Sequence, residues 1–377
     1  MSIPPFCPNQ RCLLHYENPT GTWYHRNGSH STDTFGRVQR YKCLACGKTF
    51  SDQTFSVEYW VKRIIPLEDM ERLLASSMSV RALSRHFHCS CDSVINRSDR
   101  LARQAISLHA TLRPQADKRE AVCIDGLVNF DHSQYYPNDI AISITSEARF
   151  ILAMSHAVTR RGGRLRPIQK VRKKELYKNN TFEKSAVERA FREQLDLLRY
   201  ERSPEKYKPL VLITDEKKEY RRAILKHMLF LEQDEDHRFA HLTVNSRMPR
   251  TYWNPLFPSN YIDKEIRKDQ ANFRRETGCI SRNASNCLSR LYSYVVYHNY
   301  VKRYLIAWPR DMNATHAEVA GIEAEKITQA REQFFKLRAF VSRLALKVID
   351  WKIWVKAVYN PRKQKIAYSY IPKFAFD

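Results

Sequence analysis

Residues 121 to 130 read AVCIDGLVNF, an apolar, strand-forming run interrupted by one aspartate and one glycine. Asp125 lies where a charge is costly, because a carboxylate leaves water readily only when it is paired or binds a metal ion. A second apolar run, PLVLITD, ends in Asp215. These two aspartates are therefore the first candidates for a functional site.

The segments around the two runs predict the order of a sheet. IAISITS and RFILAMSHAV follow the first run after short polar breaks, as in an antiparallel meander. A helical segment, PLVLITD, a helix, the strand FAHLTVN and a helix beginning near NYIDKEIRKDQANFRRE come next. This order is typical of an RNase H-like α/β domain, predicted over residues 119–300. Fold class is thus α+β, with several domains.

In such a sheet the strands of Asp125 and Asp215 are neighbours, and both carboxylates would face one point at a strand end. Hard oxygen ligands at this position suit Mg²⁺ or Mn²⁺. For Asp215 alone, an ordinary helix N-cap is an equally good interpretation.

A third carboxylate is expected from the last helix, where Asp263 and Glu265 are both candidates. At 100° per residue they flank the predicted apolar stripe on opposite sides. The side of Asp263 continues into Arg267, which suits binding of DNA phosphates. Either acid could instead be a surface charge paired four residues along the helix.

Two close cysteine pairs stand at the start of the chain, Cys7 with Cys12 and Cys43 with Cys46. Four thiolates in two knuckles are the ligand set that Zn²⁺ prefers in structural sites. We therefore predict a small β-rich zinc ribbon over residues 5–52. The alternative is two unrelated pairs of buried cysteines.

Residues 64–108 have helical periodicity and predict a helix-turn-helix unit, with a second helix over 91–106. The side chains on the predicted outer face of this helix suit contacts to DNA bases and phosphates: Ser93, Asn96, Arg97, Arg100 and Arg103. A solvated charged stripe is the alternative. The polar segment 111–120 is predicted to be a linker to the larger domain.

Lysine and arginine number 64 and aspartate and glutamate 40, a formal net charge of +24. Such an excess predicts a polyanionic partner, and nucleic acid is favoured over charge that serves solubility alone. No apolar run reaches the length of a membrane span, and the first residues do not resemble a signal peptide. We expect a cytoplasmic protein without a membrane partner.

Two further segments are basic or helical. Residues 159–180 are predicted either to clamp DNA or to form a disordered insertion. Residues 301–377 are predicted to be a helical extension that ends in a β-hairpin around NPRKQK. This extension could close the catalytic domain, hold a second subunit or lie on DNA.

With these motifs, the chain resembles the DDE-type transposases of bacterial insertion sequences that carry a zinc ribbon and a helix-turn-helix before an RNase H-like domain. The matching stretches span about residues 5 to 300: CPNQRC with YKCLACGKTFS, ALSRHFHCSCDSVINR, CIDG, LITDEKKEYRRAI, and NYIDKEIRKDQANFRRET with ISRN. The resemblance implies that Asp125 and Asp215 are catalytic acids. The family's third acid is usually a glutamate about four residues before a basic residue, a place that Asp263 holds relative to Arg267.

The resemblance also implies an activity. Two metal ions would let water cut one strand at the element's end, and the freed 3′-hydroxyl would attack double-stranded target DNA. The protein would act as a homo-oligomer on DNA. A DNA-binding regulator with an inactive RNase H-like domain and a structure-selective nuclease that never joins strands are the alternatives.

Overall fold

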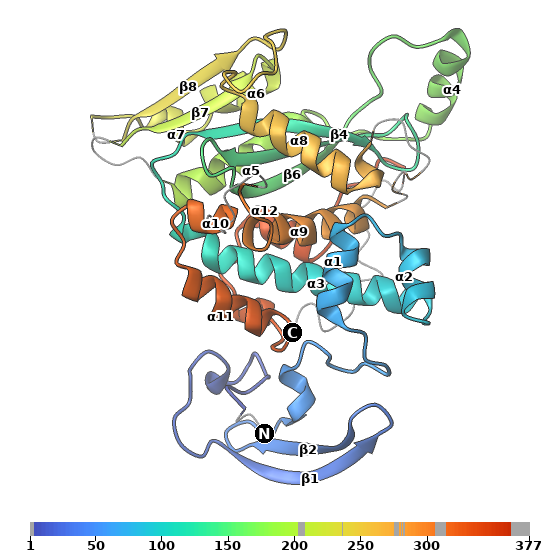
Figure 1. Ribbon diagram of the computed structural model, residues 1–377, viewed down its shortest axis with the longest axis vertical. Helices are drawn as coiled ribbons and strands as arrows, with labels where there is room; N and C mark the ends of the chain where they lie inside the picture. Colours follow the sequence, from blue (N-terminus) through green and yellow to red (C-terminus); the bar gives the residue numbers. More distant parts are fainter. Residues whose placement is uncertain are drawn as a thin grey trace.

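The computed structural model describes residues 4–202, 208–235, 237–274, 279, 281, 283–305 and 314–362 (Figure 1). It is a mixed α/β protein with two sheets, ordered β1-β2-β3 and β6-β5-β4-β7-β8. None of the described helices is both long and apolar enough to span a membrane.

The smaller sheet forms the N-terminal unit. Its strands are antiparallel: β1 (Tyr24–Thr32), β2 (Gly36–Cys43) and β3 (Thr49–Ser51). Two 3₁₀ turns flank it, η1 (Leu13–His15) and η2 (Asp52–Phe55). Trp23 and Phe50 stack with their ring centroids 5.6 Å apart in an apolar cluster of this unit's own. The three strands lie within residues 5–52, the range predicted for the ribbon.

Three helices follow: α1 (Leu67–Ala75), α2 (Val80–His86) and α3 (Cys91–Leu112). Ser79 and Ser90 cap α2 and α3, each accepting a hydrogen bond from a backbone N–H of the first turn. Helix α3 is longer than predicted and packs along α9 (Ala284–Tyr300). These helices share one hydrophobic core with the larger sheet.

The predicted linker over 111–120 is wrong. Leu112 and Ala116 are buried, and the 3₁₀ turn η3 (Arg113–Gln115) continues directly from α3. The side chain of Arg113 is completely buried and forms ion pairs with Glu201 and Asp350. A polar segment is buried here because its partners come from distant parts of the chain.

The larger sheet contains five strands: β4 (Val122–Phe130), β5 (Pro137–Thr145), β6 (Ile151–Val158), β7 (Leu210–Asp215) and β8 (Phe239–Val244). The first three are antiparallel, whereas β7 is parallel to β4 and β8 is parallel to β7. Helix α5 (Ala186–Glu201) packs on β5 and β6, and α8 (Phe257–Asp269) packs on β4 and β5. In Figure 1, α8 crosses in front of β4.

The remaining helices are α4 (Pro167–Tyr177), α6 (Lys218–Leu225), α7 (Met228–Leu231), α10 (His316–Val319), α11 (Ala324–Phe334) and α12 (Val348–Trp354). Residues 351–354 belong to α12, so the first strand of the predicted hairpin is wrong. Its second half lies outside the described residues.

The segment after α11 joins the N-terminal unit to the body, which the sequence did not indicate. Leu337 forms a β-bridge with Ser56, and Phe340 lies in the apolar cluster of the ribbon. His15 Nε2 is 2.7 Å from Ser342 Oγ. The C-terminal extension therefore holds the small sheet in place.

Candidate active site and candidate metal centre

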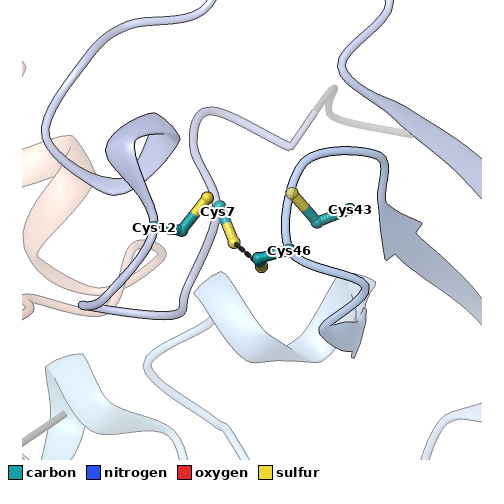
Figure 2. Close-up of side chains that lie close together, drawn as sticks. All are labelled: Cys7, Cys12, Cys43 and Cys46. Carbon is teal, nitrogen blue, oxygen red and sulfur yellow. Dashed lines mark hydrogen bonds between the residues drawn. The ribbon is translucent and has the colours of Figure 1, made fainter.

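Four cysteines from two loops of the N-terminal unit converge (Figure 2). The Sγ atoms of Cys7, Cys12, Cys43 and Cys46 all lie within 4.8 Å of one another. Cys7 Sγ is 3.6 Å from Cys46 Sγ. Tetrahedral zinc with bonds of about 2.3 Å needs sulfur atoms about 3.8 Å apart. The group thus fits a structural metal ion such as zinc.

The surroundings of the cysteines support this fit. Burial and neighbouring sulfur atoms raise the pKa of Cys7. Burial also acts to raise the pKa of Cys46, but hydrogen bonds from Asn9 and the backbone of Lys48 outweigh it and lower the value to about 7. Four thiolates in this space repel one another unless a cation is bound. His15 is not a ligand, because its Nδ1 contacts the Cys7 carbonyl oxygen at 2.7 Å.

Asp125 and Asp215 lie side by side on adjacent strands. In the parallel pairing of β4 and β7, Ile124 is opposite Thr214, and each aspartate is the next residue of its strand. Side chains alternate along a strand, so both carboxylates point to the same face of the sheet. Helix α6 begins at Lys218 with Lys217 as its N-cap residue, so Asp215 is not the N-cap. Its Oδ1 does accept a hydrogen bond from the Lys217 backbone N–H at 3.1 Å.

Asp263 on α8 belongs to the same electrostatic group. Burial, with the charges of Asp215 and Asp263, raises the pKa of Asp125 to about 6. A hydrogen bond of 2.7 Å from the Gly126 N–H to Asp125 Oδ1 opposes this shift, as does the charge of Lys217. The three carboxylates therefore repel one another in the free protein.

Glu265 points elsewhere, although it lies only two residues from Asp263. Its carboxylate is buried and accepts hydrogen bonds from Lys302 and, at 2.9 Å, from Lys268. Burial acts to raise the pKa of Glu265, but these two ammonium groups outweigh burial and lower it. Of the two candidates that the sequence left open, Asp263 forms an ion pair with Arg267 and acts on the charge of Asp125, whereas Glu265 forms an ion pair with Lys302.

The three aspartates fit hard divalent cations by their chemistry. Carboxylate oxygens are the ligands that Mg²⁺ and Mn²⁺ prefer, and a bound cation would relieve their repulsion. Within the described part of the chain, the cysteine group is the one set of three or more such ligand residues drawn together tightly enough to hold one ion. The three aspartates are not drawn together this tightly.

Arg267 lies beside the acids. Its Nη2 donates to Asp263 Oδ2 at 3.3 Å, and both side chains are 23% exposed. A guanidinium in this position can also contact a phosphate that approaches the site.

A partly buried ion pair supports the strand of Asp125 from the opposite face, and sequence reasoning missed it. Lys217 Nζ lies 3.0 Å from Asp139 Oδ2 and 3.2 Å from Tyr220 Oη. This pair packs directly against Gly126, where a Cβ atom would be 2.3 Å from Asp139 Oδ1. Gly126, which follows Asp125, is the sequence feature that could have indicated a close contact at this position.

The prediction that α3 exposes its arginines is wrong. Arg97, Arg100 and Arg103 are only 6%, 7% and 6% exposed. Arg97 donates to the Arg63 carbonyl oxygen at 2.9 Å, and Arg100 donates to the Val57 carbonyl oxygen at 2.8 Å. The connection from the ribbon lies on this face of α3, so these arginines hold the connection.

Ser93 and Asn96 remain partly exposed. Asn96 Oδ1 accepts from Arg97 and Arg100 at 3.2 and 3.0 Å. Ser90 caps the start of α3, and its Oγ accepts from the Ser93 N–H at 3.1 Å and lies 3.0 Å from Ser93 Oγ. Of the five predicted contacts of α3, only these two are accessible to a partner.

Comparison with known proteins finds no family model that matches this chain and no curated protein that is significantly similar to it. The geometry of the two sites therefore carries the functional argument.

Proposed function

We propose that this protein is a DDE-type transposase, which binds the ends of an insertion sequence and catalyses metal-dependent DNA strand cleavage and strand transfer. The observation that carries the proposal is the placement of Asp125 and Asp215 side by side on the adjacent parallel strands β4 and β7; the charges of Asp215 and Asp263 also raise the pKa of Asp125. These acids come from two adjacent parallel strands and from helix α8, which packs on β4 and β5. We interpret the sheet order β6-β5-β4-β7-β8 as RNase H-like.

In this proposal Asp125, Asp215 and Asp263 would hold Mg²⁺ or Mn²⁺. The ions would activate a water or a 3′-hydroxyl and stabilise the leaving oxygen of the phosphodiester. The Asp125 side chain is partly buried. The hydrogen bond from the Gly126 N–H to Asp125 Oδ1 orients its carboxylate. Arg267 keeps a positive charge where the phosphate would lie. No serine or tyrosine nucleophile is required.

The charge of +24 supports double-stranded DNA as the partner, both as element ends and as target. A sheet with metal ions binds phosphates but does not read sequence, so a separate reader is needed. We assign that role to the zinc ribbon and to the end of α3 at Ser93. A homo-oligomer on DNA and a cytoplasmic location belong to the same proposal.

The test is cleavage and joining of labelled DNA that carries the ends flanking the gene, with Mg²⁺ or Mn²⁺. We expect Asp125→Asn, Asp215→Asn and Asp263→Asn to lower both steps by at least about a hundredfold, the scale of losing one electrostatic stabiliser. Glu265→Gln is the matched control on the same helix and should retain cleavage if it folds.

The other functions would give different results. Binding of the ends without cutting, by the wild-type protein, would favour the DNA-binding regulator. Cutting without joining would favour the nuclease. Loss of activity in Glu265→Gln but not in Asp263→Asn would overturn the assignment of the third acid.

A further inference from the structure

The segment between β6 and α5 carries a helix that stands apart from the body. Helix α4 projects on its own loop at the upper right of Figure 1. None of its residues is buried. Residues 159–178 contain nine lysines and arginines and a single glutamate, Glu175. We call residues 159–180 the basic arm.

The arm is anchored to the sheet by its own contacts. Tyr135, Tyr136, Val158 and Phe182 form a small apolar cluster at its root, against which Leu176 and Tyr177 pack. Tyr177 Oη donates to the Tyr135 carbonyl oxygen and accepts from the Arg161 N–H at 2.8 Å. Lys173 Nζ donates to the Arg161 carbonyl oxygen at 2.6 Å. The helix is thus held in a fixed place.

The two faces of α4 differ. Residues Lys173, Leu176 and Tyr177 make the contacts to the root. At 100° per residue, the opposite face is centred on the apolar side chains of Ile168 and Val171, with Glu175, the partner of Arg172, between them. These two side chains are 77% and 60% exposed.

Basic residues border this apolar face on both sides. The same geometry places Arg172 on one side, and Lys170 and Lys174 on the other. Arg172 has a weak exposed pair with Glu175 at 3.4 Å. Within the part of the chain that the structure describes, the side chains of Lys170 and Lys174 make neither a hydrogen bond nor an ion pair. Exposed positive charge beside exposed apolar side chains fits a partner that offers both an anionic and an apolar surface.

We infer that α4 lies in a groove of duplex DNA, with Ile168 and Val171 against bases and sugars and with Lys170, Arg172 and Lys174 against the flanking phosphates. A major groove about 12 Å wide admits one helix, and its walls are rows of phosphates. Apolar side chains can contact thymine methyl groups on its floor. A second copy of the arm would present the same positive charge and would be repelled.

The root of the arm lies at a defined distance from the acids. Arg161 at its root lies over the ring of Phe130, the last residue of β4, at 5.8 Å. Asp125 is five residues earlier in that strand, or about 17 Å at about 3.4 Å per residue. This length corresponds to about five base-pair steps of duplex. One DNA molecule can therefore reach both the acids and the arm.

The inference rests on the proposed function in taking DNA as the substrate. Its test is the affinity for a fluorescent duplex, measured by anisotropy at several salt concentrations. The charge variant is Lys170→Gln/Arg172→Gln/Lys174→Gln and the apolar variant is Ile168→Ser/Val171→Ser. The matched control, Lys118→Gln/Lys326→Gln/Lys336→Gln, removes three exposed charges elsewhere on the molecule. Because α4 buries none of its residues, both arm variants should fold. The control changes only exposed side chains and should fold as well.

We expect the charge variant to reduce the slope of log affinity against log salt by about two to three, since each phosphate contact contributes about 0.9. The apolar variant should bind about tenfold more weakly with an unchanged slope. The control should behave as wild type. The inference would be overturned if both arm variants kept the wild-type slope and affinity. It would also be overturned if the apolar variant kept its DNA affinity and changed only the molecular mass in light scattering, because the apolar face would then bind a second copy of the chain. A wild-type protein that binds no duplex would instead contradict the proposed function itself.

Discussion

Arg113 and Asp350 meet at the centre of the molecule, with Arg113 Nη2 2.7 Å from Asp350 Oδ2 and neither side chain more than 1% exposed. The same guanidinium donates two hydrogen bonds of 2.7 Å to Glu201, and Tyr292 donates to Asp350 at 2.6 Å. The end of α3, the end of α5 and helix α12 are thus joined by one buried charge network. Such a network is costly to interrupt, because the remaining charges stay buried without a partner.

Replacing Arg113 by methionine should therefore destabilise the protein by about 3–5 kcal/mol, the usual cost of removing one partner of a buried ion pair. The free energy of unfolding in urea measures this effect. Adding Asp350→Asn to Arg113→Met should recover part of the loss, since one uncompensated charge is removed.

Arg119→Ala is the matched control for this prediction. Arg119 forms a short ion pair with Asp117 at 2.6 Å, but its side chain is 71% exposed. An exposed pair contributes little, and we expect a change below about 1 kcal/mol. Equal effects of the two arginine substitutions would contradict the central role of Arg113.

The sequence predicted the features that depend on local pattern. An apolar strand with one charge identified Asp125, and spacing alone identified the four cysteines. The arginines of α3 were misplaced because a charged stripe looks the same whether water or another segment covers it. The choice between Asp263 and Glu265 depends on Lys302, which comes from a distant part of the chain. Segment 111–120 was misread for the same reason, since Arg113 is buried only because Glu201 and Asp350 surround it.

Asp125 should make stability depend on pH. Its pKa is about 6 in the folded protein, against about 3.9 in the unfolded chain. The folded state therefore binds more protons between these values, and stability falls as the pH rises through this range, by up to about 3 kcal/mol. Asp125→Asn removes the penalty, so it should stabilise the metal-free protein at pH 7.5 but not at pH 3.5. Unfolding curves at the two pH values measure the difference.

Glu265→Gln should have the opposite sign, which makes it a useful comparison. The folded-state pKa of Glu265 is lowered by Lys302 and Lys268. Its contribution to stability is present at neutral pH and is lost as the pH falls through that lowered value. The substitution should therefore destabilise the protein most at neutral pH. Stabilisation at pH 7.5 would show that Glu265 belongs with the repelling acids.

A divalent cation should stabilise the wild-type protein at pH 7.5, as Asp125→Asn does in the absence of metal. Binding to the folded state alone stabilises it by mass action, and the three aspartates are the expected ligands. We expect Mn²⁺ to raise the melting temperature of the wild type at pH 7.5 and to leave Asp125→Asn unchanged. An equal rise in both proteins would place the cation elsewhere.

The cysteine group should hold about one zinc ion per chain. Cys43→Ser should remove the metal and open the N-terminal unit to proteases, because that unit has only a small apolar cluster of its own. Helical content should persist, since the main core does not include the cysteine group. Cys91→Ser is the control, because Cys91 lies outside the group. Elemental analysis that finds no zinc in the wild type would remove the metal centre.

Gly126→Ala tests the support beneath the acids. Its Cβ would lie 2.3 Å from Asp139 Oδ1 and 2.9 Å from Lys217 Nζ. The partly buried ion pair must then shift, and we expect a loss of about 1–3 kcal/mol, the usual cost of overpacking a buried site. Gly162→Ala is the control, since no atom lies within 4 Å of its added Cβ. Because Lys217 also opposes the rise in the Asp125 pKa, its displacement should raise that pKa further. NMR titration of the Asp125 carboxyl measures that shift, and an unchanged pKa would show that Lys217 does not act on the acids.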